Sequence, residues 1–198
     1  IQIRSFLDSG AWFDRTVPGI LQPEPFVSHW VRLADLPYAA LAWALAPFAG
    51  REAALGVATF AVPLLLLWPV LHALRQIVGS LGFARPDAVF ALALPFIVPA
   101  LFEFAPDRID YHNLEMALLL VVVALAMAPP RPATAAALGA ITALALAISL
   151  EFALFLLVPM ALAALDFVRG EEGAGRRLAA LGAALATTAA VAFVLIAP

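Results

Sequence analysis

Long apolar runs separated by short charged segments dominate the sequence, and this pattern limits the folds open to the chain. Hydrophobic residues make up 65% of the 198 residues and charged residues only 13%, and the mean hydropathy is +1.01. Soluble domains carry about 25% charged residues. Runs of about 20 apolar residues are long enough to cross a bilayer as helices. The composition therefore predicts an all-α fold, a polytopic transmembrane helix bundle.

Six segments are expected to span the membrane. The first is 53–74, which would be about 33 Å long as a helix. The apolar stretch 133–168 is too long for one span, because about 54 Å of helix exceeds the roughly 30 Å of hydrocarbon. We divide it into two spans with Glu151 at the turn between them. The remaining spans are 88–105, 114–128 and 178–198.

Residues 1–52 are expected to form an extracytoplasmic loop with amphipathic and juxtamembrane helices, and residues 53–198 the bundle. Segment 1–35 mixes charged and aromatic residues, and its prolines prevent a long helix. Segment 36–50 is apolar but has only 15 residues, fewer than the roughly 20 that a span needs. We therefore expect it to lie along the membrane surface or to re-enter it, so that the first long loop stays on one side.

The charges of the connecting segments differ between the two faces of this topology. One face, with segments 1–52 and 103–115 and Glu151, carries ten acidic residues and five arginines. The opposite face carries four acidic residues and six arginines. The arginine counts barely differ between the faces, so we rely on the acidic residues, which are distributed more unequally, and place the acidic face outside the cytoplasm. The cytoplasmic loops would then be 75–87, 129–132 and 169–177.

Other features of the composition exclude some classes of protein. Cysteine is absent, so the 198 residues can form neither a disulfide nor a thiolate metal site. The net charge of -3 argues against a nucleic-acid partner. All basic residues are arginine, which is typical of GC-rich bacterial genes, so we expect a bacterial inner membrane protein. The sequence begins at Ile1 and stops at Pro198 inside an apolar run, and we therefore expect it to be a fragment.

One polar stretch, residues 107–115, lies between two apolar runs and is the first candidate for a functional site. Its four formal charges would cost roughly 12 kcal/mol at the bilayer centre, so the stretch must lie outside the hydrocarbon. Polar groups at the mouth of membrane helices often carry function. Asp110 and His112 could bind one divalent ion if the backbone between them is turned or extended rather than helical.

A structural role is the alternative for the same stretch. Asp110 or Asn113 could cap the helix that begins there, because short polar side chains accept hydrogen bonds from the first free N–H groups. Glu115 would then lie in the first turn near the positive end of the helix dipole, and Arg108 would be a solvated partner. The two roles are compatible, since a carboxylate has two oxygens.

Two sequence motifs resemble a known family of membrane enzymes. The segment RIDYHNLE resembles the Asp-x-His motif in the second external loop of archaeal oligosaccharyltransferase catalytic subunits and of bacterial relatives with the GT-C fold. The segments QIRSFLDSGAWFD and SHWVRLADLPYAAL resemble the first external loop of those bacterial relatives. The motifs also occur in the order that the family has. Tyr111 departs from the pattern, because histidine is usual at that position.

The resemblance implies an integral membrane glycosyltransferase of the GT-C kind. It implies that Asp110 and His112 bind a divalent metal, Mn or Mg, which neutralises the phosphate of a polyprenyl-phosphate-linked sugar donor. A third ligand, an aspartate of the first loop, would lie upstream of Ile1. Glu115 is the candidate for an acid/base or supporting role. The acceptor would be a hydroxyl or an amide.

Four further residues are candidates for binding the substrate: His29, Arg32, Arg108 and Glu151. Arg32 could bind a phosphate with two parallel hydrogen bonds, or it could form an i,i+3 ion pair with Asp35 beside an interfacial tryptophan. Glu151 either marks a hairpin at the outer surface near the donor, or it is buried and protonated.

Two other functions agree with the composition, a membrane transporter and a non-catalytic membrane subunit. An acidic mouth could concentrate cations for transport. Transport also predicts polar groups at bilayer depth, however, and the expected spans are almost free of charge. A non-catalytic subunit predicts that the stretch 107–115 tolerates substitution.

Overall fold

The computed structural model describes residues 2–17, 26–28 and 31–197, and these residues are almost entirely helical. The helices are α1 (Gln2–Ser9), α2 (Leu36–Ala49), α3 (Arg51–Ser80), α4 (Pro86–Leu101), α5 (Tyr111–Met127), α6 (Pro132–Ile148), α7 (Ala153–Val168) and α8 (Ala174–Ile196). Two short 3-10 helices, Arg32–Ala34 and Phe102–Phe104, precede α2 and follow α4. The strands β1 (Thr16–Val17) and β2 (Phe26–Val27) form an antiparallel pair, which the sequence did not predict. The all-α prediction is confirmed.

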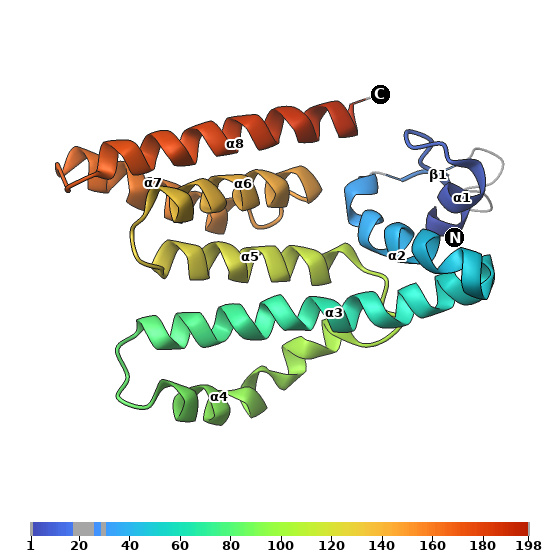
Figure 1. Ribbon diagram of the computed structural model, residues 1–198, viewed down its shortest axis with the longest axis horizontal. Coiled ribbons are helices and arrows are strands. Elements are labelled where there is room, and N and C mark those ends of the chain that lie inside the picture. The colour runs from blue at the N-terminus through green and yellow to red at the C-terminus, as the bar shows by residue number, and fades with distance from the viewer. Residues whose placement is uncertain (1, 18–25, 29–30, 198) are drawn as a thin grey trace.

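The long helices α3, α5, α6 and α8 lie side by side, and α4 and α7 pack against them (Figure 1). The connections α3–α4, α5–α6 and α7–α8 lie at one end of the bundle. The connections α4–α5 and α6–α7 lie toward the other end, where α1, α2 and β1 also pack. We call this second end the site end. It gathers the described parts of the segments that the predicted topology places on the acidic face.

Several helices extend into the predicted loops, and two of these differences have local reasons. The helix α3 continues to Ser80, so the first residues of the predicted loop 75–87 are helical. No proline follows in that stretch until Pro86, and Gly82 with a φ of 74° makes the turn. The helix α8 begins at Ala174, inside the predicted loop 169–177, directly after a left-handed Gly173. The expected break within 133–168 is present, with the turn lying between α6 and α7.

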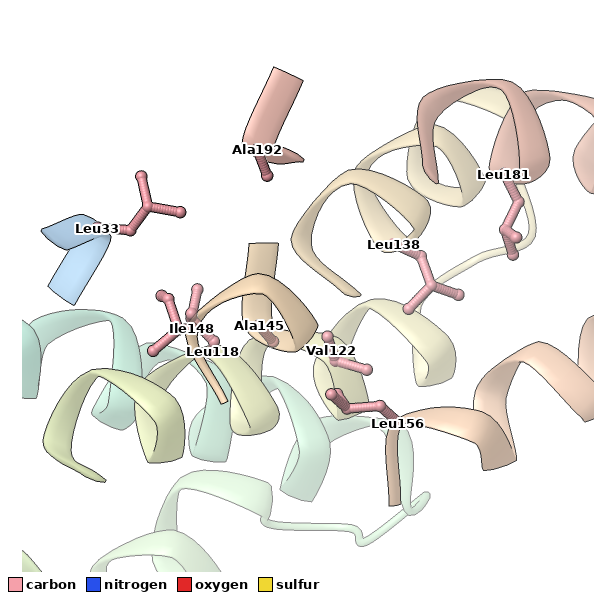
Figure 2. Packing of buried hydrophobic residues seen from close by; sticks show 9 residues of the cluster. All are labelled: Leu33, Leu118, Val122, Leu138, Ala145, Ile148, Leu156, Leu181 and Ala192. Carbon is pink, nitrogen blue, oxygen red and sulfur yellow. The ribbon is translucent and has the colours of Figure 1, made fainter. Parts of the chain in front are cut away.

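The main buried cluster joins α5, α6, α7 and α8 and includes Leu33 from the N-terminal segment. Figure 2 shows its residues: Leu33, Leu118, Val122, Leu138, Ala145, Ile148, Leu156, Leu181 and Ala192. The helices α6 and α8 approach each other closely where Gly139 faces the backbone of Leu181. Small residues permit this approach because they keep side-chain atoms out of the interface. The cluster fixes α6 and therefore the turn that follows it.

Much of the outer surface of the bundle is apolar. Large side chains such as Phe48, Trp68, Val168 and Phe193 are between 71% and 89% exposed. By length and composition, α3 and α8 are each able to cross a membrane, and α2, α5, α6 and α7 are shorter apolar helices. Only 11% of the most apolar part of α8 is buried. A helix of a soluble protein normally buries its apolar side, whereas α8 leaves most of it on the surface.

Candidate functional site

The start of α5 is built around Asp110, which has extended backbone dihedrals of φ -136° and ψ 140°. Its carboxylate caps the helix, because Oδ1 accepts a hydrogen bond of 3.1 Å from the backbone N–H of His112. The same oxygen lies 2.6 Å from Nδ1 of the His112 imidazole. Because the residue before the helix is extended, the two side chains can converge. The capping role and the pairing of Asp110 with His112 therefore occur together.

Glu151 reaches this pair from the turn between α6 and α7. The Ser149 hydroxyl oxygen accepts a hydrogen bond of 3.1 Å from the Glu151 backbone N–H, which shapes the turn. One carboxylate oxygen of Glu151 accepts a 2.5 Å hydrogen bond from the Tyr111 hydroxyl. The other lies 3.2 Å from Nε2 of His112. The fold thus joins residues 40 positions apart, and the Tyr111 and His112 rings stack with centroids 4.1 Å apart.

Glu115 lies one turn further along α5 and completes the group. Its side chain is almost fully buried, at 1% exposure, and neither carboxylate oxygen makes a close, well-aligned hydrogen bond. The Ser149 side chain and the Phe152 backbone approach it as weaker hydrogen-bond donors. One ligand atom each of His112, Glu115 and Glu151 lies within 4.8 Å of the others. We call Asp110, His112, Glu115 and Glu151 the acidic cluster.

The acidic cluster changes the proton affinity of its neighbours. Burial lowers the pKa of His112, but the hydrogen bond and charge of Asp110 and the charge of Glu151 outweigh that effect and raise the pKa above its usual value. The hydrogen bond to Glu151, with some burial, raises the pKa of Tyr111 to about 12. Tyr111 therefore remains a hydrogen-bond donor at neutral pH. The carboxylates of the cluster therefore favour the positively charged form of the His112 imidazole.

The loop before α5 is held by a second set of contacts. Asp107 has a positive φ of 64°, and its backbone N–H donates to the Thr59 carbonyl oxygen at 3.1 Å. The Thr59 hydroxyl donates to the Asp107 carboxylate at 2.8 Å, so α3 holds the loop at two points. Sequence reasoning missed Thr59, because nothing in an apolar run marks which residue will meet a loop 48 positions away.

Asn113, the other residue that the sequence offered as a cap, lies inside α5 instead, and it contacts Tyr38, which the sequence did not single out. The Asn113 amide is fully buried and donates to the Tyr38 hydroxyl and to the Arg108 carbonyl oxygen, both at 3.2 Å. The Arg108 side chain pairs with Glu103 at 2.7 Å and lies 4.0 Å from Asp110. This predicted substrate-binding residue thus lies beside the acidic cluster with its charge already shared between two carboxylates.

A cavity of about 1390 Å³ opens beside the acidic cluster. It is bordered by α1, α2, α3 and the loop before α5, and Asp110, Tyr111 and His112 lie on its wall. The other charged residues on its described wall are Arg4, Asp8, Asp35 and Glu52. Arg4 is paired with Glu52 at 2.5 Å. The described wall is therefore acidic, and a phosphate could bind there only with a cation that balances the charge.

Arg32 does not line this cavity, although it is hydrogen-bonded to two residues of the wall, Gln2 and Asp35. Its side chain is buried, donates to the Gln2 carbonyl oxygen and to Asp35 at 3.1 Å each, and lies over the Phe6 ring with its guanidinium carbon 5.2 Å from the centroid. It also donates to the backbone carbonyl of Asp14. These contacts fold the first loop onto α1, so the i,i+3 pair with Asp35 that the sequence indicated is present. His29 lies outside the described residues.

The donor set of the acidic cluster fits a divalent cation. It combines one imidazole with carboxylates, and one of these, Glu115, is buried. Such a carboxylate is costly to bury unless it is paired, protonated or bound to a metal. The residues of the acidic cluster are therefore of the kind that could hold a divalent metal.

The chain was also compared with known proteins. No protein-family model matches it, and no similar protein was found among curated sequences or solved structures.

Proposed function

We propose that the chain is part of an integral membrane glycosyltransferase of the GT-C kind, acting at the outer face of a bacterial inner membrane. It would transfer a sugar or oligosaccharide from a polyprenyl-phosphate-linked donor. The observation that carries the proposal is the acidic cluster, which borders a large cavity at one end of a bundle with an apolar surface. A donor with a lipid tail and an anionic phosphate needs both an apolar flank and a charged site.

Several features support the placement of α3 to α8 as six spans. The helices α5 and α6 have 17 residues each and would be about 25 Å long, close to the lower limit for crossing the hydrocarbon. Their connections alternate between the two ends of the bundle (Figure 1). Exposed aromatic and aliphatic side chains cover the bundle, which is costly in water and favourable in lipid. We assign the site end to the extracytoplasmic face because it carries the acidic segments.

In the proposed reaction the acceptor hydroxyl or amide attacks the anomeric carbon of the donor. The bond between that carbon and the phosphate oxygen breaks, polyprenyl phosphate leaves, and the acceptor proton passes to a carboxylate of the cavity wall. Asp110 and Tyr111 hold His112 and Glu151 in place. A bound divalent metal, Mn or Mg, would supply Lewis-acid stabilisation of the charge on the departing phosphate.

The test is sugar transfer by the full-length protein in membranes that contain a labelled polyprenyl-phosphate sugar. Asp110→Ala and His112→Ala should each abolish transfer while leaving membrane insertion unchanged. The matched control is Asp166→Ala, an acidic residue in α7 near the opposite end of the bundle, which should transfer like the unsubstituted protein. Full activity of both site variants would end the proposal.

A further inference from the structure

We propose that Tyr38 is a specificity-determining residue, which donates a hydrogen bond to a hydroxyl group of the transferred sugar in the cavity beside the acidic cluster. The inference deepens the proposed function and rests on it for the identity of the ligand as a sugar. Tyr38 lies in α2, is only 3% exposed, and lines the cavity. Binding of a sugar lipid at this wall can be measured without any transfer.

The contacts of Tyr38 leave its hydroxyl hydrogen without an acceptor. The amide nitrogen of Asn113 lies 3.2 Å from the Tyr38 hydroxyl and 3.2 Å from the Arg108 carbonyl oxygen. The carbonyl fixes the orientation of the amide, because a rotated amide would turn Oδ1 toward another oxygen that can only accept. Asn113 therefore donates and the Tyr38 oxygen accepts. No described residue accepts a hydrogen bond from the Tyr38 O–H.

The surroundings keep this hydroxyl protonated. Burial raises the pKa of Tyr38, and the charges of Asp110 and Asp35 raise it further, while the hydrogen bond from Asn113 opposes them only in part. A hydroxyl that accepts one hydrogen bond becomes a better donor of the next one. A buried donor without an acceptor is unfavourable unless a ligand or water supplies one. Tyr38 therefore offers a donor to the occupant of the cavity.

Two carboxylates on the same wall offer acceptors. Asp35 uses Oδ2 to accept from Arg32, and Asp110 uses Oδ1 to accept from His112. Within the described residues, Oδ1 of Asp35 accepts no hydrogen bond, and Oδ2 of Asp110 makes only a 4.0 Å ion pair. Both side chains line the cavity and are partly exposed, at 16% and 27%. The wall around Tyr38 therefore presents one donor and two acceptors.

This combination selects a hydroxyl group over a single charge. An ammonium group only donates hydrogen bonds and would leave the Tyr38 O–H unpaired, whereas an ionised phosphate only accepts them and would meet two carboxylates. A sugar hydroxyl can accept from Tyr38 and donate to a carboxylate at the same time. The cavity, at about 1390 Å³, also exceeds the roughly 300–1,000 Å³ typical of small-molecule pockets, so a sugar fits within it.

The experiment measures binding by protection of one cysteine from a maleimide. The reporter is Ile109→Cys, on the cavity wall and 51% exposed, in full-length protein with no other cysteine. The probes are polyprenyl phosphate alone and polyprenyl phosphate linked to glucose, mannose or galactose. At least one sugar lipid should protect the cysteine at a lower concentration than polyprenyl phosphate alone. Protection that is equal for all four lipids would overturn the inference.

The sugar lipid that binds best is then compared with its monodeoxy analogues, in the reporter protein with and without Tyr38→Phe. Loss of one particular hydroxyl should weaken binding to the protein that retains Tyr38 by roughly 3- to 10-fold, the value of a neutral hydrogen bond. Tyr38→Phe should weaken binding of the complete sugar lipid by the same factor. It should bind that one deoxy analogue, and polyprenyl phosphate alone, as well as the protein with Tyr38 does.

A purely structural role of Tyr38 predicts a different pattern, in which Tyr38→Phe weakens the binding of every lipid alike. That result would overturn the inference. So would equal binding of all the deoxy analogues and the complete sugar lipid to the protein that retains Tyr38, a result that needs no Tyr38 variant. Thermal unfolding checks that Tyr38→Phe is folded.

Ser9→Ala is the matched control on the same wall. The Ser9 hydroxyl lines the cavity, but it already donates to the Ser5 carbonyl oxygen at 2.8 Å. Its removal should therefore leave the preference among the lipids unchanged. A loss of sugar preference in Ser9→Ala equal to that in Tyr38→Phe would contradict the assignment of the donor to Tyr38.

Failure of this inference is distinguishable from failure of the proposed function. The expected binding pattern in a protein that transfers no sugar would retain the role of Tyr38 and remove the glycosyltransferase. Sugar transfer with unchanged selectivity among the deoxy analogues in Tyr38→Phe would retain the glycosyltransferase and remove the role of Tyr38.

Discussion

The contact between α6 and α8 gives a quantitative prediction, because a single methyl group at Gly139 should separate two helices. A Cβ at this position would overlap the backbone carbonyl oxygen of Leu181, which cannot rotate away as a flexible side chain would. Overpacking of this kind costs about 1–3 kcal/mol. Alanine also gains about 1 kcal/mol over glycine in helix propensity, so the free energy of unfolding of Gly139→Ala should fall by about 0–2 kcal/mol.

Gly182 provides the matched control on the facing helix. No atom lies within 4 Å of a Cβ at Gly182, so Gly182→Ala should gain the propensity term alone. The difference between the two variants isolates the steric cost, about 1–3 kcal/mol. The assay is unfolding of the full-length protein from detergent micelles with sodium dodecyl sulfate. Equal stability of the two variants would refute the close approach of α6 and α8, and with it the positioning of the turn that carries Glu151.

Three further predictions concern the first loop and the topology. Arg32→Met should lower the free energy of unfolding by about 3–5 kcal/mol in chemical denaturation, because it leaves the Asp35 carboxylate buried without its partner; a stable variant with impaired donor binding would instead favour a phosphate-binding role. Burial raises the pKa of Asp35, and the hydrogen bond and charge of Arg32 only partly oppose this effect. Between the unfolded pKa of 3.8 and the raised native pKa, the native protein therefore binds more protons than the unfolded chain. The contribution of Asp35 to stability should therefore fall as pH rises through that window, and Asp35→Asn should flatten the profile of unfolding against pH. Finally, single cysteines at Ile109 and Arg131, in otherwise cysteine-free protein, should react with an impermeant maleimide from outside and inside the cell respectively; labelling of both from one side would contradict the six-span topology.

The helices could be predicted because the apolar runs, and the polar residues and prolines that separate them, are local properties of the sequence. The break within 133–168 could be predicted from length alone, since one helix would exceed the bilayer, and the structure has it between α6 and α7. The end of α3 could not be predicted in this way, because the residues after 74 form a helix as readily as a loop. Helix propensity does not show where a chain leaves the membrane.

The acidic cluster was only partly predictable for a different reason. Asp110, His112 and Glu115 are neighbours in sequence, so their proximity could be expected from the motif. Glu151 comes from a turn 39 residues after His112, and its contact with the imidazole depends on how α5 packs against α6 and α7. Likewise, the burial of Arg32 depends on the path of the first loop. The contact of Glu151 and the burial of Arg32 both depend on long-range packing, which no local sequence pattern shows.

The most direct test of the central claim is turnover of a purified polyprenyl-phosphate sugar by the full-length protein in liposomes, before and after removal of metal. We expect release of polyprenyl phosphate that stops with a chelator and returns when Mn²⁺ is added, and no such return in His112→Ala. A donor that is not consumed under any metal condition, by protein shown to be folded and inserted, would contradict the account.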